Sequence, residues 1–219
     1  MICLLFGPPG CGKGTQARLL SHWLGIPSVS TGALLRAYSE QPTPAGRALK
    51  QHLGAGGFAT DEMVNAIVRH RLVSAPPRLI LDGYPRTLAQ ASYFDRLIKE
   101  LHLQAPVAIH LDVDAELLVN RLSERRHCPD CLRVYNLRAE PPARVGLCDE
   151  CHTALGRRDD DTPATARRRI EIYQRITAPV LSHYKAGIFF DFNGNQPPSV
   201  LFSEMRLALG LQRAATAGP

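Results

Sequence analysis

The sequence predicts an α/β protein whose sheet is mainly parallel, because short apolar runs alternate with longer helical stretches along most of its 219 residues. The apolar runs are continuous and do not alternate with polar residues, so their strands are expected to be covered on both faces. A glycine-rich turn also joins the first run to the first helical stretch, which is the order of a strand–loop–helix unit.

Four runs have the length and composition of central strands, at residues 1–6, 78–81, 107–111 and 187–190. Helices are expected at residues 15–24, 32–38, 45–53, 61–73, 88–101, 115–126, 163–184 and 199–209. Thr162 and Pro163 are typical of a helix start. Pro179 is expected to kink the seventh helix or to end it early.

Two segments interrupt this alternation. Residues 30–73, here called the helical insertion, place helices between the first helix and the next buried strand. Residues 127–158, here called the cysteine segment, contain four cysteines, several prolines and little periodicity. Neither has the pattern of a sheet core, so we expect both to be mobile subdomains on an α/β base.

The composition is that of an ordinary globular protein, which argues against disordered, collagenous and coiled-coil classes. The formal charge is +6, and 22 of the 26 basic side chains are arginines, whose planar groups suit bidentate phosphate contacts. No apolar run approaches the ~20 residues of a membrane-spanning helix, and no basic leader precedes the first strand. A cytoplasmic protein is therefore expected.

A phosphate-binding loop is the strongest motif. The run Gly-Pro-Pro-Gly-Cys-Gly-Lys-Gly-Thr at residues 7–15 fits G-x-x-x-x-G-K, with one glycine inserted before the hydroxyl residue. Main-chain N–H groups of such a loop surround phosphates, and the following helix adds a partial positive charge. Lys13 would reach the β and γ phosphates, Thr15 would lie near Mg²⁺, and Cys11 is expected to be an exposed thiol.

The same loop, with its inserted Gly14, resembles that of adenylate kinases and close nucleoside monophosphate kinases. The resemblance continues through residues 30–36, 60–62, 81–87, 120–126 and 157–160, and so covers nearly the whole chain. It implies a three-layer α/β/α fold around a parallel five-stranded sheet. It also implies a core of residues 1–29, 74–126 and 159–219, a nucleoside-monophosphate-binding helical insertion, and a lid formed by the cysteine segment.

A phosphoryl-transfer enzyme needs a second anion site opposite the first. Arg121 and Arg125 are expected four residues apart on one helix, with a shared face, and only one or two members of the triplet at residues 167–169 can face one ligand. The resemblance assigns catalysis to Lys13, Arg86, Arg121, Arg157 and Arg169. It assigns ATP to Gly10, Gly12, Lys13, Gly14, Thr15, Arg121, Arg125 and Tyr135. It assigns AMP to Thr31, Arg36, Gly57, Ala59, Gly83, Arg86, Gln90, Arg157 and Arg169, and water-mediated Mg²⁺ binding to Thr15 and Asp82.

The cysteine segment contains two CxxC pairs, Cys128 with Cys131 and Cys148 with Cys151, separated by sixteen residues. This spacing brings four thiolates within reach of one tetrahedral metal, and four sulfur ligands leave no open position, so the metal would be structural. Zn²⁺ is the favoured occupant, with iron or a disulfide pair as alternatives.

The leading hypothesis is an adenylate kinase, which converts Mg·ATP and AMP into two ADP, acts as a monomer and needs neither nucleic acid nor a membrane. A kinase for another nucleoside monophosphate is the nearest alternative. A zinc-ribbon NTPase that binds nucleic acid is the third reading, although Tyr135 is the only aromatic residue in the cysteine segment.

Overall fold

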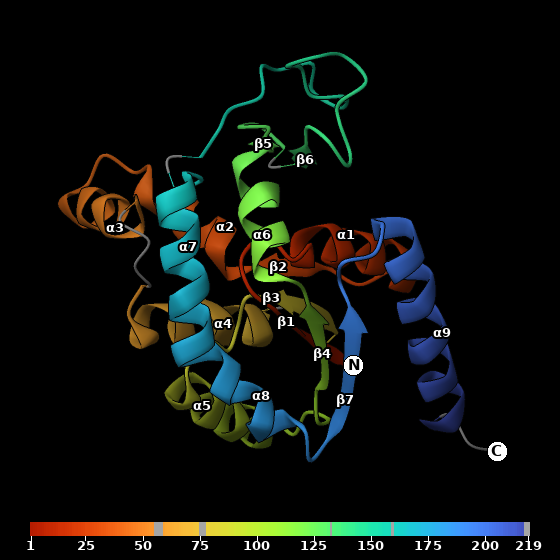
Figure 1. The fold of residues 1–219 in the computed structure, drawn as a ribbon. Coiled ribbons are helices and arrows are strands. Elements are labelled where there is room, and N and C mark those ends of the chain that lie inside the picture. The colour runs from red at the N-terminus through yellow and green to blue at the C-terminus, as the bar shows by residue number, and fades with distance from the viewer. Residues whose placement is uncertain (55–58, 75–77, 132, 159, 217–219) are drawn as a thin grey trace.

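A computed structural model describes residues 1–54, 59–74, 78–131, 133–158 and 160–210, and the backbone alone of residues 211–216. Its centre is a parallel five-stranded sheet in the order β2-β3-β1-β4-β7 (Figure 1). The strands are β1 (Ile2–Phe6), β2 (Ser28–Ser30), β3 (Leu79–Asp82), β4 (Val107–Asp112) and β7 (Ile188–Asn193). The fold class expected from the sequence is therefore confirmed.

Helices cover both faces of the sheet. One face packs against α4 (Asp61–Ser74), α5 (Leu88–Glu100) and α8 (Ala178–Tyr184), and the other against α1 (Lys13–Leu24) and α9 (Pro198–Thr216). The remaining helices are α2 (Thr31–Ser39), α3 (Pro44–Gly54), α6 (Ala115–Ser123) and α7 (Pro163–Ile172). Among the residues that the structure describes, none of these helices is both long enough and apolar enough to cross a bilayer.

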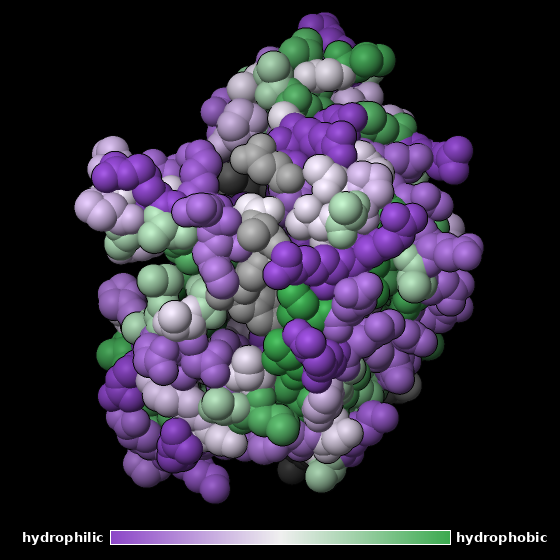
Figure 2. Space-filling view, turned by 60° about the vertical axis from the view of Figure 1, so that its left-hand side comes forward, coloured by the Kyte–Doolittle hydropathy of each residue, from purple (hydrophilic) through white to green (hydrophobic). Residues whose placement is uncertain are grey.

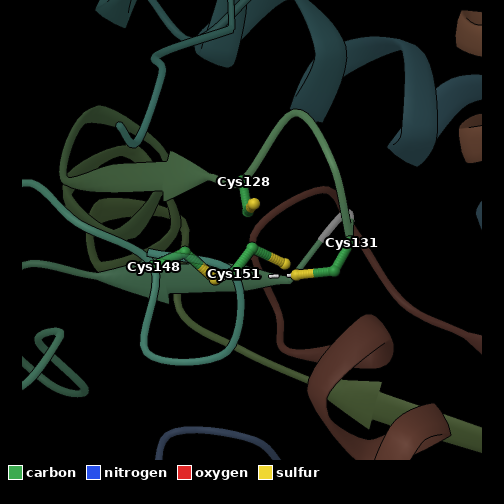
Figure 3. A group of neighbouring side chains, drawn as sticks. All are labelled: Cys128, Cys131, Cys148 and Cys151. Atoms are coloured by element: carbon green, nitrogen blue, oxygen red, sulfur yellow. Dashed lines mark hydrogen bonds between the residues drawn. The ribbon is translucent and has the colours of Figure 1, made fainter. Parts of the chain in front are cut away.

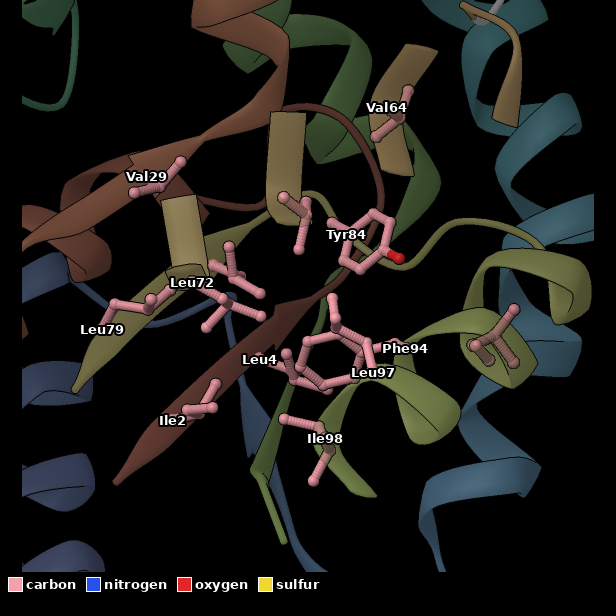
Figure 4. Close-up of a cluster of buried hydrophobic side chains, with 14 of the residues drawn as sticks. Ile2, Leu4, Val29, Val64, Leu72, Leu79, Tyr84, Phe94, Leu97 and Ile98 are labelled. Atoms are coloured by element: carbon pink, nitrogen blue, oxygen red, sulfur yellow. The ribbon is translucent and has the colours of Figure 1, made fainter. Parts of the chain in front are cut away.

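The strand pattern explains the two cores. Ile2, Leu4 and Phe6 of β1 face one cluster, which Tyr84 and Phe94 complete with an edge-to-face ring contact (Figure 4). The intervening residues of β1 belong to the cluster on the other face. All five residues of β1 are at most 2% exposed. Continuous apolar strands are therefore buried on both faces of the sheet. This burial holds in place the edge of the sheet at which the strands end.

The helix that begins at Pro163 changes its winding before Pro179. Residues Tyr173–Thr177 form one π-helical stretch, in which the N–H of Ala178 donates to the carbonyl of Tyr173. Helix α8 then starts with Pro179 in its first turn, where a missing N–H is tolerated. The proline is thus accommodated at the start of α8, directly after the widened turn.

The cysteine segment projects from one end of the molecule (Figure 1). Its regular structure begins with β5 (Arg125–His127) and continues with the antiparallel β6 (Val134–Asn136). At its base His127 and Gly156 exchange two main-chain hydrogen bonds of 2.9 Å each. Its buried cluster is small and consists of Cys128, Tyr135 and Cys148.

The largest differences from the sequence expectation concern β2 and the end of α6, while α9 and β7 extend further than expected. Strand β2 was not expected, because only Val29 among its three residues is apolar. Helix α6 was expected to reach residue 126 but ends at Ser123, because Arg125 and the next two residues pair with β6 instead.

The exposed surface in Figure 2 is mostly hydrophilic, with hydrophobic residues in separate patches.

Candidate active site

A cleft of about 1140 Å³ opens at the carboxyl ends of the parallel strands. The loop after β1, Asp82 at the end of β3, and Gly194 just after β7 all line it. Parallel strands place their following loops at one edge, which is where ligands bind in such sheets. The cleft continues over the cysteine segment and includes residues of β5 and β6.

The phosphate loop has the backbone that its glycines permit. Gly7 has φ +145°, and a Cβ there would lie 2.5 Å from the Cys11 sulfur and 2.8 Å from the Leu111 carbonyl oxygen. Gly12 has φ +100° at the start of α1, a conformation that residues with side chains rarely adopt. Lys13 Nζ donates to the carbonyls of Gly7 (2.7 Å) and Pro8 (2.9 Å). Its ammonium group therefore lies against the loop that was predicted to hold phosphates.

Cys11 is not the exposed thiol that the sequence led us to expect. It is only 1% exposed, because the loop folds its side chain inward against Gly7 and Leu111. Its sulfur lies 3.5 Å from Lys13 Nζ.

A second set of charges surrounds the loop after β3. Arg86 Nε donates to the Gly83 carbonyl (2.7 Å), and Gly83 has φ +80°. A Cβ at Gly32 would lie 3.4 Å from Arg36 Nη1 and 3.5 Å from Arg86 Nη2. The two guanidinium groups therefore converge above Gly32, at the start of α2, where a Cβ would already be in van der Waals contact with both.

The arginines of the cleft outnumber the acidic side chains that pair with them. The cleft therefore has an excess of positive charge. Arg125 makes a bidentate ion pair with the fully buried Asp161, and Arg169 Nη1 donates to Asp160 (2.6 Å). Burial, followed by the charge of Arg169, lowers the pKa of Arg86 to about 10. Burial also lowers the pKa of Arg36, where the charges of Arg125 and Arg169 act in the same direction. A polyanion bound in the cleft would favour the charged forms of these arginines and so oppose the lowering of their pKa values.

One expectation about the arginines is wrong, and the surroundings of another arginine differ from those of its neighbour. Arg121 and Arg125 do not share a helix face, because α6 ends between them; Arg121 Nη1 donates to the Gly194 carbonyl (2.8 Å). Both still line the cleft. Arg157 is exposed, donates to the Asp161 carbonyl (2.6 Å) and does not line the cleft, whereas its neighbour Arg158 does.

Arg158 is mostly buried, and its Nε has no hydrogen-bond partner among the described residues. Burial, followed by the charges of Arg125 and Arg36, lowers its pKa to about 8. In the triplet at 167–169, Arg169 lines the cleft and the other two arginines are exposed. Arg158 is thus a candidate that sequence reasoning missed.

Most of the other candidates lie on the cleft wall: Gly10, Gly12, Gly14, Thr15, Asp82, Gly83 and Tyr135. Thr31 is buried beside the cleft, and its hydroxyl donates to the carbonyls of Gly83 (3.1 Å) and Asp82 (3.3 Å). Gln90 is 3% exposed and lies behind Arg86, with its amide oxygen accepting from Arg86 N–H (2.8 Å). Ala59 packs on the core next to α4, and Gly57 lies outside the described residues.

Three other cleft residues were not predicted. Gln196 and Pro198 follow β7 and line the cleft near Arg121, and His127 lines it at the base of the cysteine segment. The signal for the first two was the position of their loop at the carboxyl edge of the sheet. For His127 the only signal was its place next to Cys128.

The four cysteines of the cysteine segment come together as a metal-binding set. Their sulfurs all lie within 4.8 Å of one another, and Cys131 and Cys148 are 3.6 Å apart (Figure 3). Four sulfurs at ~2.3 Å from a tetrahedral zinc are separated by about 3.8 Å, so the arrangement fits the ion. The Tyr135 hydroxyl, 3.4 Å from the Cys148 sulfur, lowers the pKa of that thiol to about 6, which favours the thiolate at this position. The hydrogen bond with Cys131, followed by burial, raises the pKa of Cys151 to about 12 while no metal is bound.

The start of α1 also offers oxygen ligands. A Cβ at Gly14 would lie 3.8 Å from Asp82 Oδ2, and Thr15 lines the same cleft. A carboxylate and a hydroxyl beside a phosphate loop are the groups that Mg²⁺ accepts, directly or through water.

A glycine loop and an arginine set that share one cleft define a phosphoryl-transfer enzyme with two anionic substrates. Comparison with known proteins identifies the family to which this chain belongs. The family model described as "Adenylate kinase" matches residues 5–188, and the chain belongs to the adenylate kinase family.

Similar proteins bear the same name. An "Adenylate kinase" of Anaeromyxobacter sp. (strain K) is 43% identical over 96% of this chain and 100% of its own length. Those of Syntrophotalea carbinolica and of Clostridium botulinum (strain Hall) are 41% and 38% identical, each over 96% of this chain and 99% of their own.

Proposed function

We propose that this protein catalyses the reversible, Mg²⁺-dependent transfer of the γ-phosphoryl group of ATP to AMP, which gives two ADP. The observation that carries the proposal is the shared cleft in a member of the adenylate kinase family. Lys13 and the phosphate loop line one part of it, and Arg36 and Arg86 line another. A hydrolase with one substrate would need only the first part.

In this proposal the phosphate loop holds ATP. The N–H groups around Gly10, Gly12 and Gly14 surround the phosphates, and Lys13 exchanges its carbonyl contacts for phosphate oxygens. Thr15 and Asp82 organise Mg²⁺, which neutralises charge on the phosphates. Arg121 and Tyr135 face the rest of the nucleotide, together with Gln196, because these residues line the same cleft.

The acceptor phosphate binds where Arg36 and Arg86 converge, and the acceptor base lies toward Gln90 and Ala59. Gly57, outside the described residues, stays a candidate from the sequence alone. Thr31 and Gly83 shape this side of the cleft. Arg121, Arg125 and Arg169 neutralise the charge of the phosphoryl group in transit. We place Arg158 in this group instead of Arg157, because only Arg158 lines the cleft.

Transfer in such a site requires no side-chain nucleophile. The acceptor phosphate oxygen attacks the γ-phosphorus in line with the leaving ADP, and the protein contributes positioning and charge neutralisation. The lowered pKa values of Arg36, Arg86 and Arg169 have burial as their first cause, so these arginines are preorganised and poorly solvated. Such groups stabilise a negative transition state more strongly than hydrated ones.

The domain division follows the cleft. Residues 1–29, 74–126 and 159–219 act as the core, residues 30–73 bind the monophosphate, and residues 127–158 act as a lid pinned by Zn²⁺. The lid excludes water during transfer and so limits ATP hydrolysis. All the groups named belong to one chain, which favours a monomer, and the thiolate set favours a reducing compartment such as the cytoplasm.

The test is an assay of ADP formation from Mg·ATP with AMP, GMP, CMP or UMP as acceptor, with and without the metal. We expect AMP to be preferred. A clear preference for another monophosphate would reject the adenylate kinase assignment and retain a nucleoside monophosphate kinase. Salt-sensitive oligonucleotide binding with no transfer to any acceptor would reject both.

A further inference from the structure

Asp61, the first residue of α4, is joined to the proposed base-facing side chain Gln90. Gln90 Nε2 donates to Asp61 Oδ1 at 2.6 Å. The other carboxylate oxygen, Oδ2, accepts from the Thr87 hydroxyl at 2.8 Å. The Thr87 hydroxyl in turn accepts from the Gln90 main-chain N–H at 3.1 Å, as the N-cap of α5. Asp61 is therefore held in place from the same helix turn that carries Gln90.

These contacts give the Gln90 amide one orientation. A carboxylate only accepts hydrogen bonds, so the Gln90 NH₂ group must face Asp61. A main-chain N–H only donates, so the amide oxygen must face Arg86 N, 2.8 Å away. Rotating the amide by 180° would oppose two acceptors on one side and two donors on the other. Gln90 is only 3% exposed, so water does not readily replace these contacts.

The order of donor and acceptor matters for a purine. One N–H and one lone pair of the Gln90 amide are not used by Asp61 and Arg86 N. Adenine has an acceptor at N1 and a donor at its 6-amino group. A 6-oxo purine has a donor at N1 and an acceptor at O6, so it is complementary to the opposite orientation of the amide.

We propose that Asp61 is a specificity-determining positioning residue, which fixes the Gln90 amide in the orientation that suits adenine and disfavours 6-oxo purines. The proposal rests on the proposed function, in which the base of the acceptor monophosphate lies toward Gln90. Asp61 acts through Gln90 and does not touch the reacting atoms. The geometry that carries it is the pair of opposed contacts, a carboxylate on one side of the amide and an N–H on the other.

The experiment compares kcat/KM for AMP and for inosine monophosphate, which differ only at positions 1 and 6 of the purine. Asp61→Ala is expected to lower the AMP/inosine monophosphate ratio by about tenfold, the effect of one hydrogen bond. Asp61→Asn is expected to lower it by a smaller factor, because asparagine can donate or accept and no longer selects one orientation. Asp61→Asn also decides the outcome if Asp61→Ala fails to fold, as judged by circular dichroism.

The matched control is Asn65→Ala. Asn65 also lies on α4 and accepts a hydrogen bond from the Tyr84 hydroxyl at 2.7 Å, so it too joins α4 to the core. In the described part of the chain it makes no hydrogen bond to the Gln90 side-chain amide, although the Tyr84 hydroxyl also contacts the Gln90 main-chain carbonyl at 3.3 Å. We expect the ratio to stay within about twofold of the wild-type value. In a Gln90→Ala background, Asp61→Ala is expected to leave the ratio unchanged, because its route of action has been removed.

Each result has one meaning. If both Asp61 variants keep the wild-type ratio, or if Asp61→Ala still shifts it in the Gln90→Ala background, the inference is wrong. If the folded wild type makes no ADP from ATP and AMP, the proposed function itself is wrong. An equal fall for both substrates, with the ratio unchanged, would mean that Asp61 only supports the structure and would overturn the positioning role.

Discussion

The sheet and the cysteine segment reach order by different means. The central strands β1, β3 and β4 bury nearly all of their apolar side chains, and charged groups are arranged along the edge where these strands end. Among its described residues the cysteine segment has a buried cluster of three, two of which are cysteines. Burial of so few residues contributes little stability, and the four nearby sulfurs fit a metal ion whose ligand bonds would supply the rest. The sheet is therefore ordered by packing, whereas the cysteine segment presents a set of side chains suited to hold a metal.

The largest effect is expected on the side of the sheet. Arg86→Ala should lower kcat by about a thousandfold or more, as for other arginines that neutralise a transferring phosphoryl group. The melting temperature should change little by comparison, because Arg86 lies on a loop and contributes nothing to the two cores. Steady-state kinetics and thermal unfolding on one preparation measure both. Near-normal kcat would contradict its assignment.

Metal removal tests the other side of the comparison. In Cys128→Ser/Cys131→Ser, or after chelation of the wild type, the ~10 kcal/mol of metal binding is lost and the cysteine segment should unfold locally. Hydrogen exchange should then become fast in residues 127–158 and stay slow in β1 and β4. Elemental analysis should give one metal ion per wild-type chain. A metal-free wild type with the same melting curve as the double variant would reject the structural metal.

The neighbours Arg157 and Arg158 provide a matched pair. Arg158→Ala should lower kcat/KM by about 10- to 100-fold, because it removes a buried cleft charge. Arg157→Ala should lower it by less than about threefold, since Arg157 is exposed and, among the described residues, its side chain donates to the main-chain carbonyl of Asp161. The reverse order would restore Arg157 as the functional residue.

The smallest effect is expected where the two regions meet. Tyr135 lines the cleft, and its hydroxyl contacts the Cys148 sulfur and accepts from Asp149 N–H at 2.9 Å. Tyr135→Phe keeps the ring and removes the hydroxyl. It should weaken metal binding by about tenfold, as expected for a residue that hydrogen-bonds to a metal ligand. Competition with a chromophoric chelator measures this change. Equal metal affinity in both proteins would show that the hydroxyl does not act on the cysteine set.

The sequence was most informative where one pattern repeats along consecutive residues. Continuous apolar runs located four of the five central strands, and a single motif located the loop around Lys13. Prediction was less accurate where the secondary structure of a segment depends on pairing with residues distant in the sequence. Helix α6 stops at Ser123 because residues 125–127 pair with β6, and Ser28–Ser30 becomes a strand only by pairing with β3.

The same reasoning explains what the sequence left open within the site. Arg157 and Arg158 are adjacent in a loop without periodicity, so no pattern could say which one faces the cleft. Gln196 and His127 have no motif of their own and enter the site only through the fold. Cys11 turns inward because of the φ angles of its loop, which composition does not specify.

The paired hydrogen bonds between His127 and Gly156 have a consequence for how this chain can be altered. They bring the two ends of the cysteine segment side by side, so the chain enters and leaves this segment at one point. Such a segment can be shortened, or exchanged for the equivalent segment of another protein, without changing the path of the rest of the chain.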